Sequence, residues 1–306
     1  MLEPFNIDQI GGVALYLDLV PYDIGRQRLY TAEDLYGSDN YDARVYECYL
    51  HKGKQPTTAK ELLARSMHDY CIRKAIEDFM KDRDPMLTVG VMGGHGLLRS
   101  DEQFHQTARI SKRLTEQGFL MVTGGGPGAM EATHLGAWMA GRSDADLQAA
   151  LDYLAQVPCF KDEAWLQTAM EVRRRYPQAD GYQSLGVPTW LYGHEPATPF
   201  ATHIAKLFDN SIREDFILTT AYGGIIFTPG SAGTLQEIFQ EAVQNHYLSF
   251  GFASPMIFLG RKFWQEEVPI YPLLEQLLAQ GTYKNLLLTL TDSDDVVVDT
   301  LSAGHQ

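Results

Sequence analysis

A glycine-broken turn followed by a helix is predicted at residues 228–244, which read TPGSAGTLQEIFQEAVQ. Glycine lets the backbone approach a ligand closely, and the first turn of a helix directs unpaired amides toward an anion. Glu237 follows within the helix and adds a carboxylate. The segment therefore offers the parts of an anion site, with a carboxylate that belongs either to that site or to solvated surface.

One apolar stripe runs along this predicted helix. Its members recur at helical spacing, and they are Leu235, Ile238, Phe239, Ala242 and Val243. Such a stripe is expected to face the sheet. At about 100° per residue, Glu237 and Glu241 fall roughly opposite the stripe, toward water, a cleft or another subunit. Periodicity alone favours a solvated acidic face.

Three predicted strands run into glycine-rich turns, at residues 90–100, 123–132 and 228–237. Loops that follow parallel strands lie along the carboxyl edge of the sheet, where ligands of such folds bind, so we expect the three to converge. None contains the Lys-Ser/Thr pair of a P-loop, which disfavours an NTP hydrolase. The first lacks the G-x-G-x-x-G pattern and no acidic residue closes the next strand, so a nicotinamide cofactor fits poorly.

Arg213 stands on a predicted helix that leads into the strand before the third glycine turn, beside two acidic residues. A surface ion pair is the default interpretation of that arrangement. His95, Arg99 and His134 lie near the glycine turns. Single residues of these types are more often structural than catalytic.

From residue 86 onward, short apolar runs alternate with helical patterns, which is typical of βαβ units and a parallel sheet. The runs are nearly continuous, as in strands covered on both faces. We therefore predict an α/β fold: a Rossmann-like, doubly wound, mostly parallel sheet with helices on both faces and a mixed N-terminal extension. The expected strands are 87–92, 119–124, 223–228, 255–260 and 285–290, with 183–190 (QSLGVPTW) as a further candidate. The expected helices lie near 101–117, 128–140, 203–221, 232–246 and 264–280.

Residues 1–82 are expected to form an N-terminal extension that packs on the main domain, residues 83–306. Residues 41–56 of the extension are tyrosine-rich and loop-like. Residues 57–82 are predicted to form a helix, with Thr58 and Glu61 at capping-box spacing. Its expected apolar positions include Leu62, Leu63, Tyr70 and Phe79. A helical insert of one or two helices is expected near 141–180.

The composition sets limits on the class of protein. The 306 residues, 45% of them hydrophobic, suffice for a large core, and the net charge of -14 argues against binding to nucleic acid or an anionic membrane by counterion release. Three scattered cysteines suggest neither a disulfide framework nor a zinc site. The N-terminus has acids where a secretory signal needs bases, and no apolar run approaches the ~18 residues of a membrane span. We therefore expect a soluble cytoplasmic protein.

The motifs TGGGPGAMEA (123–132), a helical Arg213 and GGIIFTPGSAGTLQE (223–237), in that order, resemble the LOG family of nucleoside 5'-monophosphate phosphoribohydrolases, which are often mislabelled lysine decarboxylases. The resemblance covers roughly residues 86–290 and is closer to the bacterial purine/pyrimidine nucleotide nucleosidases than to the plant cytokinin-activating enzymes. Two positions depart from the family pattern: Ser231 replaces the usual Gly, and Gln236 replaces a common second Glu. The P-G-x-x-G-T-x-x-E spacing itself is matched by Pro229, Gly230, Gly233, Thr234 and Glu237.

The resemblance implies hydrolysis of the N-glycosidic bond of a nucleotide such as AMP or a cytokinin riboside monophosphate, giving the free base and ribose 5-phosphate. Glu237 would be the catalytic carboxylate that stabilises positive charge on the ribose, and Arg213 would join it in the active site. The resemblance implies no cofactor or metal. It does imply a homodimer or higher homo-oligomer. The phosphate would bind at Gly230, Ser231, Ala232, Gly233 and Thr234. The rest of the pocket would involve Gly93, Gly94, Gly124, Gly125, Gly126, Gly128 and Glu131.

Two questions stay open from the sequence. Glu131 has equal claims to a contact with the ribose and to a capping role in its own helix. A non-catalytic nucleotide-binding or regulatory protein on the same fold is the alternative to an enzyme, because a fold and a phosphate loop do not by themselves make a catalyst. Base contacts would come from the extension and the insert, so the sequence does not indicate which base is preferred.

Overall fold

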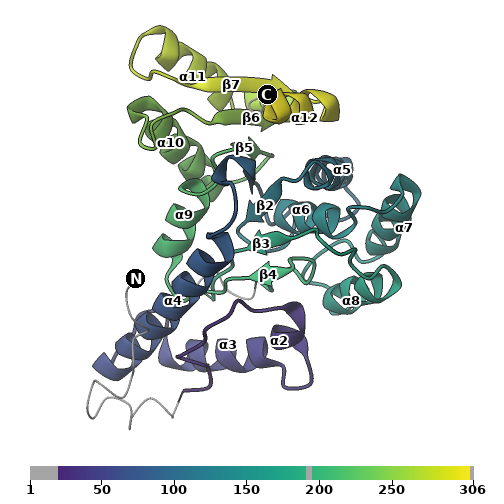
Figure 1. Ribbon diagram of the computed structural model, residues 1–306, viewed down its shortest axis with the longest axis vertical. Coiled ribbons are helices and arrows are strands. Elements are labelled where there is room, and N and C mark those ends of the chain that lie inside the picture. Colours follow the sequence, from purple (N-terminus) through teal and green to yellow (C-terminus); the bar gives the residue numbers. More distant parts are fainter. Residues whose placement is uncertain (1–19, 191–194, 304–306) are drawn as a thin grey trace.

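The computed structural model describes residues 20–190 and 195–303 and contains one seven-stranded sheet with the order β4-β3-β2-β1-β5-β6-β7. Every neighbouring pair of strands is parallel. The predicted Rossmann-like α/β fold is therefore confirmed (Figure 1). The strands are β1 (Thr88–Met92), β2 (Leu120–Thr123), β3 (Ser184–Gly186), β4 (His203–Ile204), β5 (Gly224–Phe227), β6 (Pro255–Leu259) and β7 (Leu287–Thr291).

Helices cover both faces of the sheet and close two separate cores. Because successive side chains of a strand point to opposite faces, Ile225 and Phe227 of β5 enter one core while Ile226 enters the other. One face is covered by α4 (Ala59–Met80), α9 (Asn210–Leu218), α10 (Ala232–Tyr247) and α11 (Ile270–Ala279). The other is covered by α5 (Glu102–Glu116), α6 (Ala129–Trp138) and α12 (Asp294–Ala303).

The extension is more helical than predicted. Residues 41–52, expected to be loop-like, form helix α3 (Tyr41–Lys52), and a short helix α2 (Ala32–Tyr36) precedes it. Val45 and Tyr49, one helical turn apart, are buried and give α3 its packing face, which the many polar residues hide in the sequence. Figure 1 shows α2 and α3 beyond the β4 edge of the sheet, where Tyr30 bridges Ile204.

Helix α4 buries polar residues as well as the apolar Ile72 and Ile76, and the predicted apolar positions are mostly wrong. Its expected apolar positions Leu62, Leu63 and Tyr70 are exposed, whereas Phe79 is partly buried. The Thr58 side chain does accept a hydrogen bond from the Glu61 amide, as the capping spacing indicates. The buried polar groups of this helix bond to one another and to partners in other segments; they include Glu61, Arg65, His68 and Asp69.

Two predicted helices are interrupted, each for a local reason. The expected helix 203–221 starts only at Asn210, because residues 203–204 pair with β3 and Asp209 caps α9. The expected helix 264–280 divides into a π-helix η3 (Phe263–Glu267) and α11, since Pro269 cannot continue a helix hydrogen-bond ladder. A short 3-10 turn, η2 (Pro85–Leu87), precedes β1.

The expected insert contains two helices, α7 (Asp144–Leu154) and α8 (Trp165–Arg175). Ser143 caps α7 by accepting a hydrogen bond from the Asp146 amide. Residues 1–19, the start of the predicted extension, and residues 191–194 lie outside the described residues.

Candidate functional site

The three glycine turns converge on one cavity of about 360 Å³ at the carboxyl ends of the strands. Strand β1 pairs with both β2 and β5, so the turns after these strands must lie side by side. The volume falls within the range of small-molecule sites. The lining residues are Val91, Met92, Gly93, Gly94, His95, Gly124, Met130, Glu195, Arg213, Glu214, Ser231, Ala232, Gly233, Thr234, Gln236 and Glu237.

Several of the predicted pocket glycines allow the turns to pack against each other instead of lining the cavity. A Cβ on Gly128, whose φ is +69°, would lie 2.3 Å from the Gly94 carbonyl oxygen. Gly125, at φ +68°, lies against Gly186 and Pro188. Gly126 and Gly230 likewise do not line the cavity; their missing Cβ atoms would meet Met130 and Thr234.

The predicted anion site lies at the amino end of α10, which lines the cavity. Ser231 is the N-cap residue, and Ala232 and Gly233 are exposed while the Thr234 side chain is buried. The first amides of a helix have no partner within it and carry partial positive charge. Ser231, the departure from the family pattern, keeps an extended backbone at φ -112°, which any residue can adopt. The serine is thus compatible with this turn.

Glu237 and Arg213 line the same cavity, as the resemblance implies. Glu237 is partly buried, and the pKa of its carboxyl is raised to about 7. Burial is the main cause of the rise; the charge of Glu214 adds to it, and the charge of Arg213 opposes it. The Arg213 side chain is 14% exposed, and its Nη2 atom lies 3.9 Å from Glu214 Oε1. A carboxylate that titrates near neutrality beside a cation is the kind of group found in active sites.

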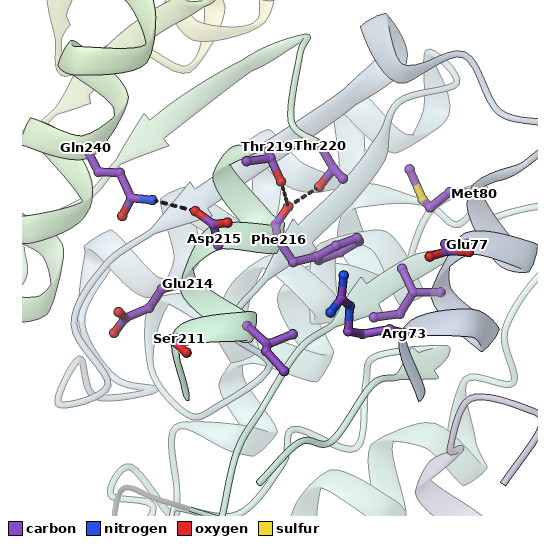
Figure 2. Close-up of a pocket in the computed structure, with 12 residues that line it drawn as sticks. Arg73, Glu77, Met80, Ser211, Glu214, Asp215, Phe216, Thr219, Thr220 and Gln240 are labelled. Carbon is purple, nitrogen blue, oxygen red and sulfur yellow. Dashed lines mark hydrogen bonds between the residues drawn. The ribbon is translucent and has the colours of Figure 1, made fainter. Parts of the chain in front are cut away.

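Two hydrogen bonds tie the helix of Arg213 to the helix of Glu237. Gln236 Nε2 donates to Glu214 Oε2 at 3.1 Å, and Gln240 Nε2 donates to Asp215 Oδ1 at 3.2 Å. Figure 2 shows the second bond beside a groove between α4 and α9. Gln236 replaces a common family Glu, and in this chain a glutamate there would face Glu214 with like charge. The departure therefore suits this pair of helices.

The other carboxylate of the predicted acidic face does not point to solvent. Glu241 is 2% exposed and accepts a hydrogen bond from the Ser254 hydroxyl, while Val243 of the expected apolar stripe is 42% exposed. Burial raises the pKa of Glu241 to about 7, and the hydrogen bond from Ser254 opposes the rise. The prediction of a solvated face is therefore wrong, because the buried surface of α10 is rotated toward the segment before β6.

Glu131 lies outside the cavity, so its predicted contact with the ribose is not supported. It is 1% exposed, accepts from Arg99 Nε at 3.1 Å and from Trp165 Nε1 at 3.2 Å. It also lies in the first turn of α6. Arg99 also binds Thr168 of the insert, so Glu131 and Arg99 together anchor the insert to α6.

Sequence reasoning missed Glu195, and it treated His95 as structural. Both line the cavity, and His95 Nδ1 lies 3.4 Å from Glu195 Oε1. No local motif marks Glu195, which reaches the site from a segment far from the glycine turns in sequence. His134, which the sequence places near a glycine turn as it does His95, is structural. It is fully buried and hydrogen-bonded to Thr123 and Ser184, and burial lowers its pKa to about 3.

Within residues 20–190 and 195–303, no group of three or more His, Cys, Asp or Glu side chains is arranged to hold a metal ion. The described helices include none that is both long enough and apolar enough to cross a membrane.

Comparisons with known proteins show likeness in structure only. No protein-family model and no curated protein matches the sequence. The molybdenum cofactor binding protein from Rippkaea orientalis is 14% identical, with a TM-score of 0.43, over 72% of this chain and 97% of that chain. The structural-genomics target TM1055 is 17% identical, with a TM-score of 0.44, over 71% and 98%. The molybdenum cofactor carrier protein from Chlamydomonas reinhardtii is 16% identical, with a TM-score of 0.41, over 71% and 98%.

Proposed function

We propose that this protein hydrolyses the N-glycosidic bond of a nucleoside 5'-monophosphate and releases the free base and ribose 5-phosphate. One observation carries the proposal. Glu237, a carboxyl whose pKa is raised to about 7, lines a cavity together with Arg213 and the amino end of α10. The motifs shared with the LOG family are the motifs that build this cavity.

The geometry suits the parts of the substrate in turn. The phosphate would bind the amides of residues 231–234, whose partial positive charge requires no basic surface. Thr234 and Glu237 are three residues apart on α10, so their side chains share one face, about 4.5 Å apart along the helix axis. A phosphate held at the start of the helix would therefore bring the ribose near Glu237.

Bond cleavage develops positive charge on the ribose ring, as in glycoside hydrolysis. The ionised Glu237 carboxylate would stabilise this charge more strongly in the transition state than in the bound substrate. Water adds its hydroxyl to C1', and the departing base takes up a proton. Arg213 would stabilise the negative charge that accumulates on the base as it leaves.

The proposal is tested by incubating the protein with AMP, GMP, IMP, CMP and UMP and measuring free base and ribose 5-phosphate by chromatography. A Glu237→Gln preparation made in parallel serves as the blank for contaminating nucleosidases. Release of both products in equal amounts is expected. Tight nucleotide binding without release from any substrate would instead identify a nucleotide-binding protein. The homo-oligomeric state stays a prediction, to be measured by light scattering.

A further inference from the structure

A second cavity, of about 680 Å³, lies between the extension and the insert. Its walls come from α2, α3 and the turn between them on one side, and from residues 160–166 on the other. Glu195 lines this cavity and also the catalytic cavity. The two cavities therefore adjoin at one carboxylate.

In the catalytic cavity, which is the 360 Å³ cavity that contains Glu237, the polar side chains extend from the start of α10 to Glu195. We call the region around Glu195, where the two cavities adjoin, the junction. Arg213, Glu237 and Glu195 line the catalytic cavity together. Burial raises the pKa of both carboxyls, and the positive charge of Arg213 lowers both. A Cβ on Gly124 would lie 3.2 Å from Arg213 Nη1, and a Cβ on Gly126 would lie 3.7 Å from Glu195 Oε2. With the phosphate at the start of α10 and the ribose at Glu237, the base of a bound nucleotide would extend past Arg213 toward Glu195.

The junction combines aromatic rings with a carboxylate. The rings of His95 and Phe160 meet edge to face, with centroids 5.9 Å apart. His95 lines the catalytic cavity and Phe160 lines the second one. Glu195 Oε1 lies 3.4 Å from His95 Nδ1 and its side chain is 23% exposed. Flat rings and a partly exposed acceptor together suit a heteroaromatic base with hydrogen-bond donors on its edge.

The charged residues of the second cavity point to the same chemistry. Among the described residues, its lining contains the acidic residues Asp162, Glu163 and Glu195 and one basic residue, Lys161; a fourth carboxylate, Asp42, is paired with Lys206. An ionised carboxylate can accept hydrogen bonds but cannot donate them. The amino group of adenine or cytosine would therefore be attracted there, while the carbonyl oxygen of hypoxanthine or uracil would face another acceptor.

We propose that the second cavity and its junction form the base-recognition subsite, and that Glu195 selects nucleotides whose base carries an exocyclic amino group. This inference rests on the proposed nucleotide hydrolysis. It also gives the extension and the insert a common role, because each supplies one wall of the subsite.

The test compares two pairs of substrates that differ at one edge of the base: AMP with IMP, and CMP with UMP. The wild-type kcat/KM should favour the amino member of each pair by roughly tenfold to a hundredfold, the range expected for one hydrogen bond to a charged group. Glu195→Gln can both donate and accept, so it should bring both ratios to within about threefold. Inhibition by ribose 5-phosphate, which lacks a base, should be unchanged.

Two further variants sharpen the test. Glu47→Gln replaces a carboxylate on α3 that is 76% exposed and outside both cavities, so it should keep the wild-type ratios. Phe160→Ala should raise KM for AMP without changing inhibition by ribose 5-phosphate, since it removes a ring only from the base side of the junction.

The outcomes separate this inference from the proposed function. Equal cleavage of all four nucleotides, or a preference that survives Glu195→Gln, would overturn the inference and leave nucleotide hydrolysis intact. If no nucleotide is cleaved, calorimetric binding decides: AMP binding that is tighter than IMP binding, and that loses this advantage in Glu195→Gln, would support the subsite although hydrolysis fails. Equal binding of AMP and IMP would overturn it.

Discussion

Glu237 and Glu241 form a natural matched pair for a test of the active site. They lie one turn apart on α10, and burial raises the pKa of each carboxyl to about 7. Only Glu237 lines the cavity that contains Arg213. Replacing each by Gln removes the same charge with little change in volume. We expect both variants to gain stability at alkaline pH, and only Glu237→Gln to lose activity.

The size of the stability gain follows from the raised pKa values. For Glu241, a pKa that rises from 4.5 to about 7 corresponds to on the order of 3 kcal/mol at pH 8, because each tenfold change in proton affinity is about 1.4 kcal/mol. Water reaches the more exposed Glu237 and screens part of this energy, so we expect about 2 kcal/mol there. For a chain of this size the corresponding rise in Tm is roughly 3 to 5 °C.

The sign of the pH dependence is fixed by which state binds more protons. Between pH 4.5 and about 7 the folded protein retains protons on these carboxyls that the unfolded chain has lost, so the free energy of unfolding decreases as pH rises through this range. The Gln variants have no carboxyl at these positions, so the corresponding part of the decrease in the free energy of unfolding is absent from them. Their advantage over the wild type should be near zero at pH 4 and largest above pH 7, measured by urea unfolding at several pH values.

The activity of the two variants should differ sharply. Glu237→Gln should lower kcat by at least about a hundredfold, the usual effect of removing one preorganised electrostatic group. The wild-type kcat/KM should rise with pH about tenfold per pH unit and level off near 7, as Glu237 ionises. Wild-type activity in Glu237→Gln would refute the assignment of the catalytic carboxylate. A stability difference that does not change with pH would refute the pKa argument.

Four further outcomes are expected from other parts of the site. Gly233→Ala should raise KM without lowering Tm, because a Cβ there meets no protein atom within 4 Å but enters the phosphate end of the cavity. Arg213→Gln should shift the pH dependence of kcat/KM to higher pH, because Arg213 lowers the pKa of Glu237. Glu131→Gln should cost about 3 to 5 kcal/mol in urea unfolding, because it leaves buried Arg99 without its partner. Asp69→Asn should lower stability by about 1 to 3 kcal/mol and also lower kcat, whereas in the Arg213→Gln background it should lower only stability.

The last of these expectations rests on how α9 is held. The Asp69 carboxylate, on α4 of the extension, accepts hydrogen bonds from the backbone amides of Phe208 at 3.0 Å and Asp209 at 2.8 Å. These amides immediately precede α9, which carries Arg213. Glu61→Gln is a suitable control, because Glu61 is buried on the same helix but binds Lys52 and Arg65 instead. Equal kinetic effects of the two variants would contradict a specific role for Asp69.

The sequence predicts those features that a short window of residues determines. Strands β1, β2, β5 and β6 are apolar runs covered on both faces, so their positions follow from hydrophobicity alone. The edge strand β7 is also an apolar run, although Leu287 is exposed. The glycine turns and Glu237 are marked by spacing. Strand β4 contains only two residues, and its pairing with β3 leaves no periodic signal.

Features that depend on a distant partner escape such a prediction. Glu131 is satisfied by Arg99, 32 residues away, and Glu241 by Ser254 beyond the end of its own helix. Glu195 reaches the cavity from a segment without a motif. In each case the sequence reveals the charge but not the group that faces it, and that group decides between core, surface and site.

The charges of the cavity that contains Glu237 suit the proposal that backbone amides, not a basic side chain, bind the phosphate there. The lining includes three carboxylates, Glu195, Glu214 and Glu237, against the guanidinium of Arg213 and the imidazole of His95. A phosphate group brought beside Glu237 adds further negative charge, which would raise the pKa of that carboxyl unless positive charge at the phosphate offset it. The fixed dipoles at the start of α10 bind the phosphate without a mobile cation that could pair with Glu237. Arg213 is thus left in the same cavity as Glu237 and Glu195, where, in the proposed reaction, it would act on the bond between ribose and base.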